Sequence, residues 1–202
     1  MKRIQIILLL VIAVTIFSCD KKTENTDKPK ETPKTETKKT DDNTNDLKLY
    51  KMESVEDSKE KNVAPNFTWT ENGTKKSLND LKGKIVFLNF WATWCKPCKK
   101  EMPDLISITE DLKDKNFQMI GINVFQQASA PKIEEFLKTN PLSYITVDGN
   151  DELLQAFSKA SGNDMGAVPT TFILDKTGKI VETVVGGRDK EAYLKLINKH
   201  LN

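Results

Sequence analysis

Residues 85–91, IVFLNFW, form a run of β-branched and aromatic side chains in which only Asn89 is polar. A strand with one face in water alternates apolar and polar residues, whereas a strand covered on both faces is apolar almost throughout. The run therefore predicts a central strand in a sheet that has both faces covered. We expect Phe90 and Trp91 to belong to the core or the sheet.

Strand and helix patterns alternate around this run over residues 62–202, a length of roughly 140 residues that is enough for one domain with its own core. Two short strands, at residues 67–70 and 74–78, flank an Asn-Gly pair that is a strong hairpin signal. Further strands are expected at residues 117–124, 144–147, 170–174 and 180–185. Helices are expected at residues 96–113, 131–139, 151–159 and 189–201. This order predicts an α/β fold with a mixed central sheet flanked by helices.

A positive segment, Lys2 and Arg3, precedes an apolar run at residues 4–17. The run is shorter than the roughly 20 apolar residues that a comfortable transmembrane helix needs, and it has the length of a secretory signal. It leads into the sequence IFSC, which resembles a bacterial lipobox. We predict that residues 1–18 are a lipoprotein signal peptide and that Cys19 is lipidated. An uncleaved signal anchor is the alternative, and both hypotheses place the rest of the chain outside the cytoplasm, in the cell envelope and at a membrane.

Lysine, threonine, asparagine and acidic residues dominate residues 20–61, with almost no apolar side chain before Leu47. Such a composition cannot bury enough surface to offset the entropy of ordering the chain. We assign residues 19–61 to a lipidated N-terminus and a disordered tether, and residues 62–202 to the domain. The alternative for residues 47–55 is a short helix packed on the domain.

Two of the three cysteines, Cys95 and Cys98, follow the apolar run as a Cys-x-x-Cys pair. As a structural disulfide the pair would close so small a loop that it would remove little unfolded-state entropy. A zinc site would need two more ligands. However, Cys19 is assigned to the anchor, and the single histidine, His200, lies in a terminal helix where we expect it to face solvent. A redox couple is the interpretation that remains, and we expect neither a metal nor a cofactor.

The pair lies where the buried strand gives way to a helix, so Cys95 is expected at the helix N-terminus. Unpaired N–H groups and the helix dipole stabilise a thiolate there, and Lys96 adds a positive charge. Cys98 lies one turn further along, where it should be shielded. We predict that Cys95 attacks a substrate disulfide and that Cys98 then resolves the mixed disulfide.

The motif WCKPC, after FLNFWAT and before KKEMP, resembles the thioredoxin superfamily, and in particular its membrane-anchored TlpA/ResA-type thiol-disulfide oxidoreductases. A second motif, AVPTTF at residues 167–172 followed by DKTG, resembles the cis-proline loop of that family with its strand and turn. Residues 123–151 resemble the helix and strand that this branch inserts. The resemblance covers residues 63–202 and implies a thioredoxin-like fold with an N-terminal β-hairpin and a TlpA-type helix-strand insert.

The resemblance also implies a set of substrate-binding residues. Pro169 is expected to be cis and to lie beside the thiols, and the backbone of Val168 is expected to pair with an extended substrate. Trp94 matches the tryptophan that flanks the nucleophile, where ordinary packing and substrate contact are equally good interpretations. Lys96 and Pro97, between the two cysteines, complete the set.

Thioredoxin itself carries a buried aspartate six residues before the first cysteine, where this chain has Asn89. An amide cannot accept the proton of the resolving thiol. Glu101 lies three residues after Cys98 on the same helical face and matches a glutamate of ResA-like members. Buried beside a thiol, its pKa should rise, which would suit proton exchange with Cys98. The alternative is a surface glutamate in a Lys-Lys-Glu run.

The leading hypothesis is an extracytoplasmic reductase of protein disulfides, a function that the resemblance associates with cytochrome c maturation. It implies apocytochrome c or other disulfide-bonded proteins as substrates, and a membrane thiol-transfer protein as the electron donor. Lys96 should stabilise the thiolate and push the potential upward, so the direction of electron flow stays open. The 31 basic and 29 acidic residues nearly cancel, which gives no reason to expect a nucleic-acid partner.

Two other functions fit parts of the pattern. A thiol peroxidase of the peroxiredoxin type needs a threonine three residues before the nucleophile, where this chain has Ala92, with Thr93 one place off. A thioredoxin-like lipoprotein that binds without turnover is the second, and the intact pair of thiols together with Pro169 argues against it.

Overall fold

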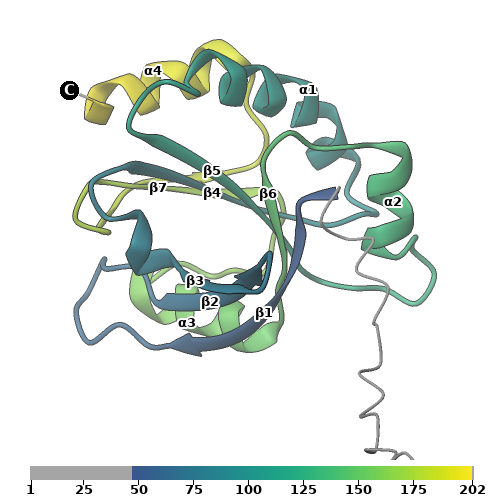
Figure 1. Ribbon diagram of the computed structural model, residues 1–202, viewed down its shortest axis with the longest axis horizontal. Helices are drawn as coiled ribbons and strands as arrows, with labels where there is room; N and C mark the ends of the chain where they lie inside the picture. The colour runs from purple at the N-terminus through teal and green to yellow at the C-terminus, as the bar shows by residue number, and fades with distance from the viewer. Residues whose placement is uncertain (1–46, 202) are drawn as a thin grey trace, which may run out of the picture. The chain divides into compact units, whose positions relative to one another are not determined.

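The computed structural model describes residues 47–201 (Figure 1), so the predicted signal peptide, Cys19 and most of the predicted tether lie outside the described residues. Over this range the chain forms eight strands: β1 (Leu49–Glu56), β2 (Asn66–Glu71), β3 (Thr74–Ser77), β4 (Ile85–Trp91), β5 (Phe117–Asn123), β6 (Ile145–Asp148), β7 (Thr170–Leu174) and β8 (Ile180–Val185). It also forms a short 3-10 helix and four α-helices: η2 (Leu78–Leu81), α1 (Lys96–Asp111), α2 (Ile133–Thr139), α3 (Asp151–Ser161) and α4 (Lys190–Leu201). The expected alternation of strands and helices is confirmed, with boundaries that differ by a few residues.

The strands form one mixed sheet in the order β3-β2-β1-β6-β5-β4-β7-β8. Strand β4 runs parallel to β5 and antiparallel to β7, and β5 and β6 are also parallel. The expected hairpins, β2 with β3 and β7 with β8, are both present. The structure therefore has the thioredoxin-like α/β architecture that the resemblance implied, including α2 and β6 as the inserted helix and strand.

Strand β4 is buried on both faces, as its apolar run predicted. Its alternate residues enter two separate cores. Ile85, Phe87 and Trp91 pack with side chains of α1, α2 and α4, whereas Val86, Leu88 and Phe90 pack with side chains of α3 and β2. Figure 1 shows α1 and α4 together on one side of β4 and α3 on the other.

Residues 49–56 form strand β1, so the assignment of this segment to the tether is wrong, and so is the alternative of a short helix. Leu49, Tyr50 and Met52 are buried, and β1 joins the two parts of the sheet by pairing in parallel with β6 and antiparallel with β2. The backbone of β1 thus pairs on one edge with the next strand along the chain and on the other edge with a strand far away in the sequence, and these hydrogen bonds stabilise it.

Helix α4 begins at Lys190, one residue later than expected, because the carboxylate of Asp189 accepts a hydrogen bond from the N–H of Ala192 in the manner of an N-cap (2.9 Å). His200 does not face solvent freely as predicted. Its side chain is half-buried, with Nε2 3.2 Å from Oε1 of Glu182 on β8. No helix within residues 47–201 is both long and apolar enough to cross a membrane.

Candidate active site

Cys95 and Cys98 form a disulfide at the N-terminus of α1, directly after the buried strand β4. Cys95 is the N-cap residue of the helix, and its Sγ accepts a hydrogen bond from the N–H of Cys98 at 3.2 Å. Pro97, in the first turn, has no N–H to leave unpaired, which suits this position. The strand therefore fixes the pair against the end of the helix, where the free N–H groups favour negative charge on sulfur.

Both cysteines are buried in the disulfide form. Cys98 is 1% exposed, as expected for a shielded thiol, and Cys95 is only 2% exposed. Lys96 and Pro97 between them are exposed to solvent. In this form, therefore, little of either sulfur is open to solvent.

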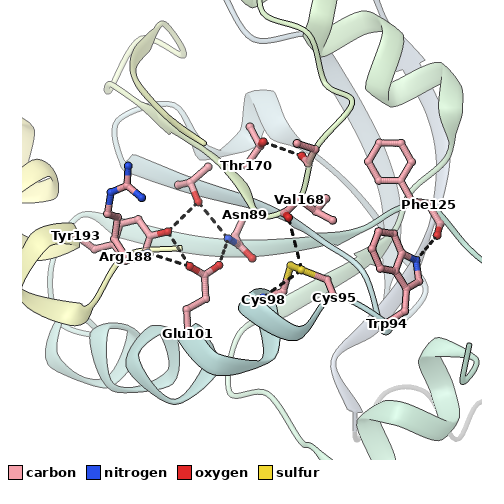
Figure 2. Close-up of a disulfide and its surroundings, with 12 residues drawn as sticks. Asn89, Trp94, Cys95, Cys98, Glu101, Phe125, Val168, Thr170, Arg188 and Tyr193 are labelled. Atoms are coloured by element: carbon pink, nitrogen blue, oxygen red, sulfur yellow. Dashed lines mark hydrogen bonds between the residues drawn. A yellow bond between two sulfur atoms is a disulfide. The ribbon is translucent and has the colours of Figure 1, made fainter. Parts of the chain in front are cut away.

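The Val168–Pro169 peptide bond is cis, as predicted, and it lies opposite the disulfide. The carbonyl oxygen of Val168 is 3.6 Å from Sγ of Cys95, although the two residues are 73 positions apart in the sequence. The loop is held there because β7, which begins at Thr170, pairs with β4 just ahead of the cysteines. Figure 2 shows this carbonyl directed at the sulfur atoms.

A cleft of about 790 Å³ opens beside the disulfide. Trp94, the residue before Cys95, is 38% exposed and donates its indole N–H to the carbonyl oxygen of Phe125 at 2.7 Å. Phe125 follows β5 with a φ of 53°, a backbone conformation that non-glycine residues rarely adopt. The cleft lies between this aromatic pair and the cis-proline loop, and its lining comprises Trp94, Phe125, Gln126, Gln127, Gly149, Asn150, Asp151, Gly166, Ala167 and Val168. Sequence reasoning missed Phe125, because no local motif marks it.

Glu101 is 4% exposed, so the alternative of a surface glutamate is wrong. Its carboxylate lies on the opposite side of the disulfide from Trp94 (Figure 2). Three groups donate hydrogen bonds to it: Nδ2 of Asn89 to Oε1 (2.9 Å), and the hydroxyl of Tyr193 (2.9 Å) and the N–H of Arg188 (3.3 Å) to Oε2. Asn89, at the position of the thioredoxin aspartate, thus donates a hydrogen bond to Glu101. The sequence did not indicate Tyr193 or Arg188.

Burial raises the pKa of Glu101 above its ordinary value, as predicted. The three hydrogen bonds and the positive charge of Arg188 act in the opposite direction, because they stabilise the ionised carboxylate. Desolvation is the largest of these effects, so the net shift is upward. A carboxyl group with a raised pKa can take up and release a proton nearer neutral pH than an exposed glutamate can.

The structure also shows where the two residues that bear on a peroxidase function lie. Ala92 is buried at the position where a peroxidase would need a threonine. Thr93 is buried as well, and its hydroxyl donates to the carbonyl oxygen of Pro131 at 2.8 Å. That hydroxyl is therefore held by the loop before α2.

A Cys-x-x-Cys disulfide at the start of a helix, opposite a cis-proline in a mixed α/β sheet, defines a thiol-disulfide oxidoreductase with the thioredoxin fold. Residues 61–183 match the family model described as the AhpC/TSA family. The chain is 39% identical over 130 residues to the thiol-disulfide oxidoreductase ResA of a Bacillus cereus strain, a match that covers 63% of this chain and 70% of the relative. The chain belongs to the AhpC/TSA family, in the thioredoxin superfamily, and to its ResA-type thiol-disulfide oxidoreductases.

Solved structures agree with this assignment. A thiol:disulfide interchange protein of the thioredoxin family from Chlorobium tepidum TLS aligns with a TM-score of 0.62 at 30% identity, over 72% of this chain and 99% of the other. StoA from Bacillus subtilis aligns with a TM-score of 0.54 at 27% identity, over 66% of this chain and 97% of the other.

Proposed function

We propose that this protein reduces disulfides in other proteins outside the cytoplasm, with Cys95 as the nucleophile and Cys98 as the resolving thiol. The observation that carries the proposal is the position of the pair. Sγ of Cys95 caps α1 and faces the carbonyl oxygen of Val168, a residue that also lines the cleft, whereas Cys98 lies one turn further along the helix. This arrangement supports Cys95, rather than Cys98, as the sulfur that meets a substrate.

Reduction proceeds in two exchange steps from the dithiol form. The Cys95 thiolate attacks one sulfur of the substrate disulfide, which breaks the substrate S–S bond, forms a mixed disulfide and releases one substrate thiolate. The Cys98 thiolate then attacks Sγ of Cys95. This step releases the second substrate thiolate and forms the Cys95–Cys98 disulfide. The substrate gains two electrons and the pair loses two, and the protons of the pair pass to the two substrate thiolates.

Glu101 is proposed as the group that takes the proton from Cys98 before the second step. Its carboxylate is buried close to the start of the same helix, and its raised pKa allows it to hold and return a proton. Asn89, which has no basic group, serves this function only through its hydrogen bond to Glu101.

Substrate binding is assigned to the cleft and the loop beside the disulfide. An extended chain that passes Val168 and Pro169 would bring its cysteine to Sγ of Cys95 by strand-like pairing with the loop backbone. Trp94 forms the adjoining wall. Lys96 and Pro97, exposed between the cysteines, would contact the substrate on its other side.

We further propose that a lipid on Cys19 anchors the protein, which would place its domain in the cell envelope. Outside the cytoplasm the disulfide must be reduced again after each cycle, so a membrane thiol-transfer protein is proposed as the electron donor. Apocytochrome c is the proposed substrate, and cytochrome c maturation the proposed process. The ResA-type relatives support the chemistry of this proposal.

The test uses the full-length Cys98→Ala variant in its native envelope. Without the resolving thiol the mixed disulfide should persist, so substrates should stay linked to Cys95 and be identifiable by mass spectrometry. The Cys95→Ala, Cys98→Ala double variant is the matched control, which should trap nothing. An apocytochrome among the trapped proteins would support the maturation role. A binding module without turnover would trap no protein, and the wild type would fail to reduce insulin.

A further inference from the structure

The carboxylate of Glu101 accepts hydrogen bonds from Asn89 on β4, from Arg188 just ahead of α4 and from Tyr193 on α4, so two of the three donors come from the far end of the sequence. We propose that Tyr193, on α4, is a positioning residue for the exchange reaction: its hydroxyl holds Glu101 in place and stabilises the ionised carboxylate. This inference rests on the proton-accepting role of Glu101 given above. It adds a residue that lies outside both sequence motifs of the site.

Tyr193 is placed for this function by the packing of α4 on the sheet. Its side chain is fully buried, and its ring packs edge-on against Phe87 of β4 with centroids 5.0 Å apart. The hydroxyl lies 2.9 Å from Oε2 of Glu101 and 3.5 Å from Oγ1 of Thr171. The ring contact thus fixes the direction of the hydroxyl, which has two partners within reach.

The hydrogen bonds around Glu101 have a consistent direction. Asn89 donates from Nδ2 to Oε1 of Glu101 and to Oγ1 of Thr171, at 2.9 Å and 3.1 Å. Thr171 can then donate its own hydroxyl proton to Tyr193, which donates to Oε2 of Glu101. Every donor of this network is used, and the carboxylate is the one member that only accepts. A protonated Glu101 would place its proton against a group that is already a donor, so the network favours the ionised form.

Tyr193 contributes the hydrogen bond that a substitution can remove most cleanly. The Arg188 bond comes from the backbone, which any non-proline residue supplies, and Asn89 divides its amide between two acceptors. Burial and the negative charge of Glu101 both raise the pKa of Tyr193, so its hydroxyl stays protonated and remains a donor. Phenylalanine would keep the ring and its packing while removing only the hydroxyl.

Other charged and titratable groups also face Glu101 and are common to all the variants compared below. A cleft of about 350 Å³ reaches the carboxylate from the solvent side, lined by Pro97, Lys100, Glu101, Asp104, Gly187, Arg188 and Asp189. Tyr144, which is buried ahead of β6, interacts electrostatically with the carboxylate. Because a Tyr193 variant leaves all these groups in place, a change in the titration of Glu101 reports the lost hydroxyl.

The experiment compares the full-length wild type with Tyr193→Phe in detergent, with the disulfide form used for the titration and the dithiol form for insulin reduction. The titration of Glu101 is followed by NMR of ¹³C-labelled glutamate carboxyl groups, with Glu101→Gln used to assign the signal. Loss of one hydrogen bond to a charged group should raise the pKa of Glu101 by roughly one unit. The acid limb of the rate of insulin reduction should move to higher pH by a similar amount. Lys190→Ala is the control on the same helix, since it removes an ion pair with Asp111 that docks α4 on α1 but does not touch Glu101.

Thr171 supplies a second pair of variants in case Tyr193→Phe does not fold. Thr171→Val removes the hydroxyl that lies between Asn89 and Tyr193 but keeps the Tyr193 hydroxyl itself, so it should raise the pKa of Glu101 by less than Tyr193→Phe does. Thr171→Ser keeps the hydroxyl and should restore the wild-type titration.

An unchanged Glu101 titration in Tyr193→Phe, or in Thr171→Val if that is the variant that folds, would overturn the inference. The proton-accepting role of Glu101 fails separately, if Glu101→Gln leaves the pH dependence of the rate unchanged. In that case the NMR titration still decides whether Tyr193 stabilises the carboxylate. In the Glu101→Gln background, Tyr193→Phe should cause no further shift of the rate profile, and a shift there would show that Tyr193 acts by another route.

Discussion

The buried carboxyl group of Glu101 should make the stability of this protein fall as the pH rises, and Glu101→Gln should remove that dependence. Burial raises the pKa of Glu101 above 4.5, so the folded protein binds this proton more tightly than the unfolded chain does. For such a group the stabilisation is complete below the unfolded pKa and is lost as the pH rises through the folded pKa. Glutamine has no proton to lose, so the variant lacks this contribution.

The magnitude follows from the linkage between proton binding and folding. Between the unfolded and the folded pKa, the wild type should lose up to about 1.4 kcal/mol of unfolding free energy for each pH unit, relative to the variant. The glutamine amide also faces the amide of Asn89, which must rotate to pair with it. A mismatch of this kind should change the free energy of unfolding by about 1 kcal/mol at every pH. It therefore shifts the plot of stability difference against pH up or down without changing its slope.

The assay is urea unfolding of both proteins in the disulfide form, followed by tryptophan fluorescence from about pH 4 to about pH 8. All other titrating groups are shared, so they cancel in the difference between the two proteins. The stability of Glu101→Gln minus that of the wild type should rise with pH and then level off. A flat difference would show that burial does not dominate at this site. A difference that falls with pH would show that the three hydrogen bonds outweigh desolvation.

Three further variants test other parts of the structure. Trp94→Phe removes the hydrogen bond to Phe125. We expect a roughly fivefold higher KM for a protein substrate but an unchanged rate with a small aromatic disulfide. Equal effects on both substrates would argue against Trp94 as a wall of the substrate site. Gly187→Ala places a Cβ 3.0 Å from Oε2 of Glu101, so the free energy of unfolding in urea should fall by about 1 kcal/mol. An unchanged free energy of unfolding would mean that the loop shifts without cost to accommodate the methyl group. Phe157→Ala removes a fully buried ring that contacts three other aromatic rings, which should cost about 3–5 kcal/mol in the same assay; a loss below about 1 kcal/mol would contradict the packing described.

Local patterns were sufficient to predict most of the fold, because most strands and helices here carry the periodicity of their own type. Strand β1 was missed for a physical reason. Leu49, Tyr50 and Met52 do not alternate cleanly with polar residues, and the pairing with β2 shifts register between Met52 and Ser54. The strand is stabilised by β6, which lies almost a hundred residues further along the chain. Nothing within the segment itself could have indicated that partner.

The residues of the site likewise fall into two groups, those that local motifs indicate and those that only the fold brings together. The cysteine pair and Pro169 lie in short motifs whose spacing carries their chemistry, so they could be recognised from the sequence. Tyr193 fits the apolar face of its helix, and its pattern indicates burial but not the hydroxyl contact with Glu101, which is 92 residues away. Phe125 contributes a backbone carbonyl, and every residue has one. Only the folded arrangement distinguishes such groups from others of the same kind.

The burial of both sulfurs beside the cleft lined by Trp94 and Val168 has a consequence for how turnover is organised. In the proposed cycle, the electron donor and the substrate protein would both exchange with Cys95 through this entrance, one after the other, and would never meet. Initial rates measured at several donor concentrations should then give parallel double-reciprocal lines, as in other ping-pong reactions. A large excess of either partner should slow the cycle, because it would occupy the form of the enzyme that the other partner needs.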